Sequence, residues 1–579
     1  MPRRAATSRR PLVSWPLYRL LAVVALVPVL VAALTVREPS LPPPPAQPLA
    51  PFDGGAAATT AAAMLTLPKQ RNGREPGRGG DLAAAGWIAE QLGAAGCRVS
   101  TQTFAADLPG RPNVPMTNVI GYLPGRRSDL VAVVAHHDGI GTGVDDNAAA
   151  VGVMVELARE LQPLARERGL LFLSTDGGTT GGQGAAYFAG HSPFASRVSA
   201  AVVLDSLAAP SGTPLRIVIR PDTVRGTSPT LFRTTRAVVA RVTGRPPIVP
   251  GLLDQLSGLA VPYALGEQGP LLARGVPALT LTAGPPPDPG AAITSLDSGQ
   301  LGSAGTAMLN LVAQLDSAST IEPAGRPDVF LGTRTMQGWL AETALVALFA
   351  PALVTVLDMT ARCRRRRIPL APAASALTWR AAGWGTFLVA LWLLPVLPGG
   401  LASGLDVAPR PADIGIGWSG IALAAAAGLL VWRFAGRPRL LPVTPVSGAD
   451  RTGGLVAGML GLAFAATLLV AVNPFALILV LPAAHVWLLL PAAARLGRRF
   501  MLAVYAFGFT GPALLIVEYA TRFHLGASTP RALLAMTASG YLSPVVATCL
   551  VLAAASAAQV GAVIAGRYAP AHEPKHGYN

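Results

Sequence analysis

The chain has 579 residues, of which 51% are hydrophobic and only 13% are charged. It is too long for one domain, and so little charge excludes an ordinary soluble protein and indicates a membrane protein. The formal net charge of +16 comes almost entirely from arginine, because lysine occurs only at Lys69 and Lys575. The positions of the arginines therefore decide between a nucleic-acid partner and a membrane.

The first 36 residues are typical of a cytoplasmic tail followed by a signal anchor. Four arginines within residues 1–15 precede an apolar run over residues 20–36, which is long enough to cross a bilayer as a helix. No strong small-residue cleavage site follows this run, so we expect the helix to be retained. Residues 37–55 contain four consecutive prolines and are predicted to form a stiff linker.

Residues 56–320 differ in character and predict an α/β domain. Strands are expected at residues 98–104, 118–123, 130–135, 170–175, 201–204 and 278–281, and helices at residues 82–95, 148–161, 228–242 and 303–315. Because strands alternate with helices, we expect a mainly parallel sheet with helices on both faces. Cys97 is the only cysteine of this part, so the domain can hold no internal disulfide.

After a short linker at residues 321–338, residues 339–566 predict an all-α transmembrane domain of seven helices. The apolar spans lie near residues 339–359, 381–402, 414–432, 454–472, 475–493, 501–518 and 541–565. With the first span this makes eight.

Arginines concentrate in alternate connections between these spans. The arginine-rich connections contain Arg362 and Arg364–Arg367, then Arg433, Arg437, Arg439 and Arg451, then Arg495, Arg498 and Arg499, with Arg567 in the tail 567–579. By the positive-inside rule, both termini should lie in the cytoplasm and the α/β domain outside it, at the plasma membrane. The bilayer thus accounts for the basic charge, and we expect no nucleic-acid partner.

Polar residues follow the apolar strand that ends near residue 135. His136 and Asp138 come directly after it, and Asp145, Asp146 and Asn147 lie in a Gly-rich loop that opens the next helix. Ligands of open α/β sheets collect at the carboxyl ends of strands. An imidazole with carboxylates at that place is a ligand set for a divalent metal, and zinc suits it best. The alternative is a polar strand end that only caps the following helix.

A series of blocks in the chain resembles the M28 family of zinc aminopeptidases over residues 57–317. The blocks are Asn118–Gly125, Ala135–Gly139, Gly143–Ala150, Leu170–Ala189, Val202–Ser206, Gly275–Leu281 and Ala292–Asp297. Their order makes the resemblance more specific than any single block, and it implies the M28 peptidase fold. An M28-like domain on a multi-spanning membrane protein is similar to the vacuolar and endoplasmic-reticulum members of the family.

The resemblance implies a two-zinc site, of which this chain keeps one part. The ligands of one zinc fall at His136, Asp146 and Asp205, and Asp138 retains the residue that orients the ligand histidine. The other zinc shares Asp146, but its glutamate position is Thr179 and its histidine position is Ile293. We therefore expect at most one zinc.

The general base implied by the resemblance is also missing. Gly178 stands at the position of the base glutamate, and glycine has no proton acceptor. The family's Ser-Asp-His segment reads Gly266, Glu267 and Gln268. His137, Asp145 and Asp176 are alternative bases, although each also has a structural interpretation as a packed strand end, a helix cap or a turn former.

Three functions remain open from the sequence. The first is a catalytically impaired pseudo-peptidase that acts outside the cytoplasm as a binding or scaffolding module for peptides or envelope proteins. The second is a one-metal aminopeptidase or amidohydrolase that retains activity. The third is a transporter or lipid-handling membrane protein with a regulatory outer domain, for which His485 within a span is the signal.

Overall fold

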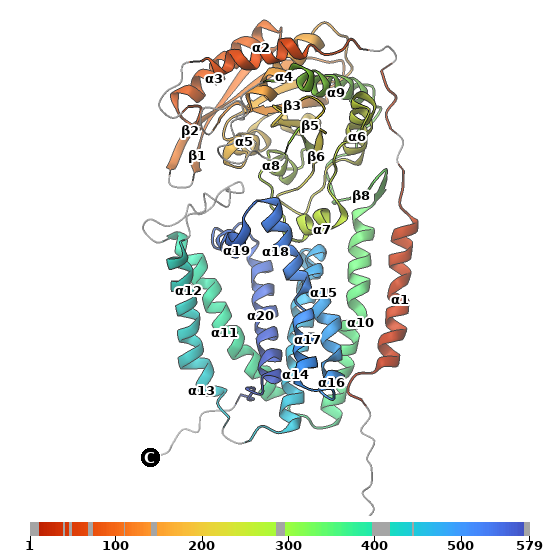
Figure 1. Ribbon diagram of the computed structural model, residues 1–579, viewed down its shortest axis with the longest axis vertical. Coiled ribbons are helices and arrows are strands. Elements are labelled where there is room, and N and C mark those ends of the chain that lie inside the picture. The colour runs from red at the N-terminus through yellow and green to blue at the C-terminus, as the bar shows by residue number, and fades with distance from the viewer. Residues whose placement is uncertain are drawn as a thin grey trace, which may run out of the picture. The chain divides into compact units, whose positions relative to one another are not determined.

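The computed structural model describes residues 11–38, 41–45, 49–67, 73–108, 111–139, 147–284, 296–396, 417–442 and 445–571 (Figure 1). The chain forms two compact units. Val36–Trp339 make up most of the first, which is an α/β unit, and the apolar helices before and after it make up the second.

A seven-stranded mixed sheet forms the centre of the α/β unit. Its strands are β1 (Arg98–Leu108), β2 (Arg111–Leu123), β3 (Leu130–His136), β4 (Gly169–Thr175), β5 (Val198–Asp205), β6 (Arg216–Val218) and β7 (Ala278–Thr282). The order is β1-β2-β4-β3-β5-β7-β6. The four central strands are parallel, whereas β1, β2 and β6 join antiparallel at the edges. The prediction of a mainly parallel sheet is confirmed, and the antiparallel edges are an addition to it.

Helices cover both faces of this sheet (Figure 1). One face carries α2 (Gly54–Leu65), α3 (Gly79–Ala94), α4 (Ala148–Leu161), α6 (Pro229–Thr243) and α9 (Ser298–Asp316), and the other carries α5 (Gln183–His191) and α8 (Gln268–Ala273). Along β3 the side chains alternate, with Val131 and Val133 in the first core and Ala132 and Val134 in the second. A strand buried on both faces explains why this segment is apolar throughout. The remaining helix of the unit is α7 (Leu252–Ala260).

The ends of the α/β unit lie beside each other. A hairpin of β8 (Val329–Leu331) and β9 (Arg334–Met336) follows α9. Arg37 pairs with Thr335 through two main-chain hydrogen bonds of 3.0 and 2.8 Å. The Pro-rich segment that follows Arg37 also lies against the unit, because the Gln314 side chain donates to the carbonyl of Pro42 at 2.5 Å.

The second unit is built from helices, most of which are apolar. They are α1 (Trp15–Leu34), α10 (Gly338–Arg365), α11 (Ala371–Leu393), α12 (Trp418–Val431), α13 (Arg437–Arg439), α14 (Gly448–Val472), α15 (Leu477–Val486), α16 (Leu490–Ala493), α17 (Arg498–Phe507), α18 (Thr510–Arg522), α19 (Thr529–Ala538) and α20 (Pro544–Ile564). Among the described residues, six helices are long and apolar enough to cross a membrane, and the pair α17 and α18, bent by 49°, would make a seventh. Because α11 is not among the six, the eight-span topology and its orientation stay predictions.

His485 of α15 is held by hydrogen bonds at both ring nitrogens. Its Nε2 lies 2.9 Å from the carbonyl oxygen of Leu348, and its Nδ1 lies 2.9 Å from the Tyr18 hydroxyl. A carbonyl only accepts, so Nε2 carries the proton and Nδ1 accepts from Tyr18. The ring thus links α1 and α10 to α15.

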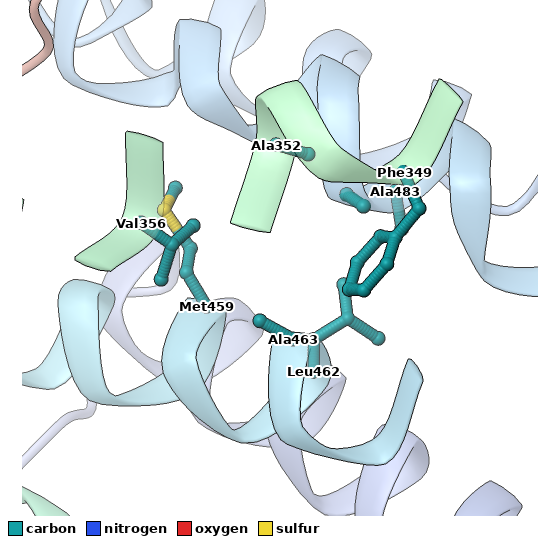
Figure 2. A pocket seen from close by; sticks show the side chains of 8 residues that line it. Phe349, Ala352, Val356, Met459, Leu462, Ala463 and Ala483 are labelled. Atoms are coloured by element: carbon teal, nitrogen blue, oxygen red, sulfur yellow. The ribbon is translucent and has the colours of Figure 1, made fainter. Parts of the chain in front are cut away.

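A small cavity lies between α10, α14 and α15 (Figure 2). Its volume of about 10 Å³ is close to the minimum that holds one water molecule. Only apolar side chains line it, among them Phe349, Val356 and Met459. This cavity therefore offers no polar side chain to a ligand.

Arg168 at the start of β4 is fully buried and anchors the carboxyl end of α9. It donates to Asp129 at 2.7 Å and to the carbonyls of Leu315, Asp316 and Ala318 at 2.7 to 2.9 Å. A guanidinium at this place also complements the partial negative charge of the helix end. One side chain therefore connects the sheet to the last helix of the domain.

We expect Arg168→Met to lower the free energy of unfolding of the α/β unit by about 3 kcal/mol or more, because it removes the donor of three carbonyls and of Oδ2 of Asp129, whose Oδ1 keeps its ion pair with Arg127. Pulse proteolysis of the full chain in urea would measure this. The matched control is Arg126→Ala, which removes an exposed pair with Glu167 and should cost less than about 1 kcal/mol. Equal effects of the two variants would contradict the anchoring role.

Candidate functional site

The carboxyl ends of β3 and β5 bring His136 and Asp205 together. Nε2 of His136 lies 3.7 Å from Oδ1 of Asp205, and Nδ1 lies 3.3 Å from Oδ1 of Asp138. Nδ1 also lies 3.2 Å from the main-chain oxygen of Asp138. Both neighbours of Nδ1 only accept, so this nitrogen carries a proton, and Nε2 faces Asp205. Asp138 therefore orients His136 as a ligand, as a carboxylate behind a metal-binding histidine does.

Asn147 fixes the spacing of the two strand ends. Its side-chain nitrogen donates to the carbonyls of His136 at 3.1 Å and Leu204 at 3.3 Å, and its oxygen accepts from the main-chain nitrogen of Ser206 at 3.2 Å. Asn147 has a left-handed backbone with φ 55°, which asparagine adopts more readily than most residues. The position before it, Asp146, lies outside the described residues, as do Asp145 and Ile293.

The charges around His136 favour a bound cation. Burial alone would lower the pKa of His136, but the hydrogen bond and charge of Asp138, with further contributions from Asp205 and Glu267, raise it well above its usual value. Burial likewise opposes the ionised form of Asp138, yet His136 and Thr179 lower the pKa of this carboxyl. A ring whose positive charge is stabilised in this way marks a point where a divalent cation would be stabilised too.

The turn after β4 leaves no room at the position of the missing base. The main-chain nitrogens of Gly178 and Thr179 donate to the two oxygens of Asp138 at 2.8 and 2.9 Å, and the Thr179 hydroxyl donates to the same carboxylate. A Cβ added to Gly178 would lie 2.3 Å from Cβ and Cγ of His136. Any side chain at residue 178 would therefore displace the histidine, and Thr179 is turned toward Asp138.

Glu267 is the functional candidate that the sequence analysis did not single out. It immediately precedes α8, is 2% exposed, and accepts a hydrogen bond from the Thr175 hydroxyl through Oε1. Burial raises its pKa to about 7, the charge of His136 lowers it, and the charges of Asp138 and Asp205 raise it. These interactions put a carboxyl that titrates near neutral pH beside His136. The signal was present, since Glu267 stands at the acidic position of the family's Ser-Asp-His segment.

Two of the alternative bases face away from this site. His137 lies on the other side of β3, where Nδ1 is 2.9 Å from the Ser174 hydroxyl and Nε2 is 3.6 Å from Oδ1 of Asp81. Burial lowers the pKa of His137 to about 4, so the ring is neutral. Asp176 lies in the same group, in which burial and neighbouring carboxylates raise the pKa of both Asp81 and Asp176. Neither residue contacts the position beside His136 and Asp205 where a cation would sit.

Comparison with known proteins identifies the domain. Residues 118–247 match the model of peptidase family M28. The chain carries a peptidase family M28 domain. No curated protein sequence matches it.

Several solved structures are similar to this M28 domain. The glutaminyl cyclase of Porphyromonas gingivalis is 17% identical over 45% of this chain and 98% of its own, with a TM-score of 0.38. The glutaminyl cyclase of Fimbriiglobus ruber is 18% identical over 48% of this chain and 99% of its own, with a TM-score of 0.39. The zinc aminopeptidase BSAP of Bacillus subtilis is 14% identical over 46% of this chain and 95% of its own, with a TM-score of 0.38. At these identities the likeness carries no statement about activity.

Two of the three predicted ligands of one metal, His136 and Asp205, lie together among the described residues of the M28 domain. The Nε2 of His136, oriented from behind by Asp138, and the carboxylate of Asp205 fit a cation that takes nitrogen and oxygen ligands. The second position that the resemblance implies offers Thr179, whose hydroxyl already donates to Asp138.

We expect Gly178→Ala to weaken zinc binding at His136 by about tenfold or more, because the new methyl group displaces the ring from its oriented position. Titration of the full chain with Zn²⁺ after dialysis against a chelator would measure it. Gly86→Ala on α3 is the control, since nothing lies within 4 Å of its added Cβ. Unchanged affinity in Gly178→Ala would mean that His136 is not a ligand.

Proposed function

We propose that this protein is a multi-pass membrane protein whose M28 domain lies outside the cytoplasm and binds peptides or envelope proteins, with hydrolysis strongly impaired. The observation that carries the proposal is the closed base position, where Gly178 touches His136 and no proton acceptor fits. The arginine pattern supports the topology, and α1 would serve as the signal anchor.

The chemistry of peptide cleavage explains why this position matters. A water molecule must be activated near neutral pH, and its proton must move to the leaving amine. Loss of the general base commonly lowers the rate by about 10²–10⁴-fold. Thr179 offers no replacement, because its hydroxyl and its main-chain nitrogen both donate to Asp138.

The remaining residues are suited to holding a ligand. His136 would bind one cation through Nε2, while Asp138 holds the ring through Nδ1. Asp205, at the end of β5, would bind the same cation through its carboxylate. The Ser206 hydroxyl donates to Oδ1 of Asp205 at 3.0 Å. Asp146 would be the third ligand by resemblance. When bound, a zinc ion polarises a carbonyl oxygen. A peptide could thus be oriented through its terminal carbonyl without being cleaved.

We expect peptide binding that depends on zinc and on His136, with aminoacyl hydrolysis no faster than in a His136→Ala variant. Calorimetric titration of short peptides and a chromogenic aminopeptidase assay on the full chain would measure the two properties. Robust, chelator-sensitive hydrolysis that disappears in His136→Ala would contradict the binding proposal.

A second function, a one-metal aminopeptidase or amidohydrolase, is favoured by one observation. Glu267 is a buried carboxyl with a pKa of about 7 beside His136, and its Oε2 accepts no hydrogen bond within the described residues. A general base is most effective when its pKa lies near the working pH. Glu267 could therefore take the role that Gly178 cannot.

Any residual hydrolysis should rise with pH up to about 7 and then level off, because Glu267 accepts a proton only when it is ionised. A bound cation would lower this pKa and move the rise to lower pH. Glu267→Gln should reduce the rate by about 10²-fold or more and remove this limb of the profile. Glu90→Gln, an exposed change on α3, is the control. An unaltered profile in Glu267→Gln would exclude Glu267 as the base.

A further inference from the structure

A second group of ligand-type side chains lies on the opposite side of β3 from His136. Asp81 comes from the first turn of α3, His137 follows β3, and Asp176 follows β4. Each is at most 2% exposed. One nitrogen of His137 and one oxygen of each carboxylate all lie within 4.8 Å of one another.

Each of these side chains is oriented by a hydrogen bond at its other polar atom. Asp81 Oδ2 accepts from the main-chain nitrogen of Gly77 at 3.0 Å, and Asp176 Oδ2 accepts from that of Thr117 at 2.8 Å. His137 Nδ1 lies 2.9 Å from the Ser174 hydroxyl. Of the atoms that remain, His137 Nε2 has no hydrogen-bond partner within the described residues, and the side chains of Asp81 and Asp176 interact with each other.

We propose that Asp81, His137 and Asp176 form a closed binding site for a divalent transition-metal cation, best suited to zinc, that is separate from the site at His136. This proposal does not depend on the proposed function, because it needs neither peptide binding nor hydrolysis.

The geometry of the group agrees with metal coordination. Zinc binds nitrogen and oxygen ligands at about 2.1 Å, which places two ligands of a tetrahedral site about 3.4 Å apart. The observed separation of His137 Nε2 and Asp81 Oδ1 is 3.6 Å. Hydrogen bonds at the outer atoms are the usual means by which metal ligands are held in place.

The charge of the group also favours a cation. Two carboxylates removed from water repel each other, and burial without enough counter-charge is costly. The buried cation nearest the group is Arg74, whose Nε donates to the carbonyl of His137 at 3.1 Å, and it supplies one positive charge for the two carboxylates. A divalent cation bound to both would neutralise them, while the neutral ring of His137 offers a lone pair. The simplest competing account is that Asp81 and Asp176 share a proton, which requires no metal.

A metal at this place would have a structural role. It would join the start of α3 to the ends of β3 and β4, three segments that are distant in sequence. Asp176 also leads directly into the turn at Gly177–Gly182 that packs against His136, so the metal would fix the base of that turn. A fully enclosed site holds its cation against dialysis, unlike the more open site at Asp205.

The test uses the full chain with His136→Ala and Asp205→Ala, which removes two ligands of the family's site. Elemental analysis after dialysis should find about one zinc per chain. Adding His137→Leu should reduce this to background, whereas adding His191→Leu, a change at an exposed histidine of the same domain, should leave it unchanged. Zinc that persists with His137→Leu, or no zinc in the parent variant, would overturn the proposal.

A second measurement guards against a variant that does not fold. Thermal unfolding of the parent variant should shift down by about 5 °C or more when a strong chelator strips the metal, and Zn²⁺ alone should reverse the shift. Asp81→Asn, which keeps the shape of the side chain, should remove most of this response. A melting temperature indifferent to chelator and to Zn²⁺ would favour the shared proton and overturn the metal site.

Discussion

The carboxylate of Asp138 is the interaction on which the candidate site depends. One oxygen faces Nδ1 of His136 and accepts from Gly178, and the other accepts twice from Thr179. The same group therefore orients the ligand histidine and holds the turn after β4 against it. One turn therefore both stabilises the orientation of His136 and leaves no space for a side chain at residue 178.

The alternation of side chains along an extended chain gives β3 two different histidines. His136 points toward β5 and the family's site, and His137 points toward α3 and Asp81. Adjacent residues thus belong to separate environments, one with acceptors at both ring nitrogens and one enclosed by carboxylates and a serine. This separation follows from strand geometry alone and needs no special backbone conformation.

Much of the fold was predictable because burial leaves a strong pattern. The predicted helix at residues 148–161 is α4 without correction, and the run that became β3 is apolar because both its faces are covered. The three-residue strand β6 carries too little pattern to be recognised. Asp81 and Glu267 were missed as site residues because only tertiary contacts bring them to their sites. In the sequence, Asp81 is an ordinary residue of a first helical turn, and Glu267 is an ordinary residue just before a short helix. The hydrogen bonds of His485 to Tyr18 and Leu348 join helices that are distant in sequence, which a single sequence cannot show.

The pairing of Arg37 with Thr335 has a mechanical consequence. Because the first and last segments of the α/β unit are fastened to each other, a pull on the flanking helices would load these two main-chain bonds before it reached the sheet. The sheet and the side chains of the candidate site would then bear such a load only after these two bonds. The two main-chain hydrogen bonds therefore close the α/β unit at its two chain ends. They involve none of the side chains of the candidate site, so a substitution there leaves this closure in place.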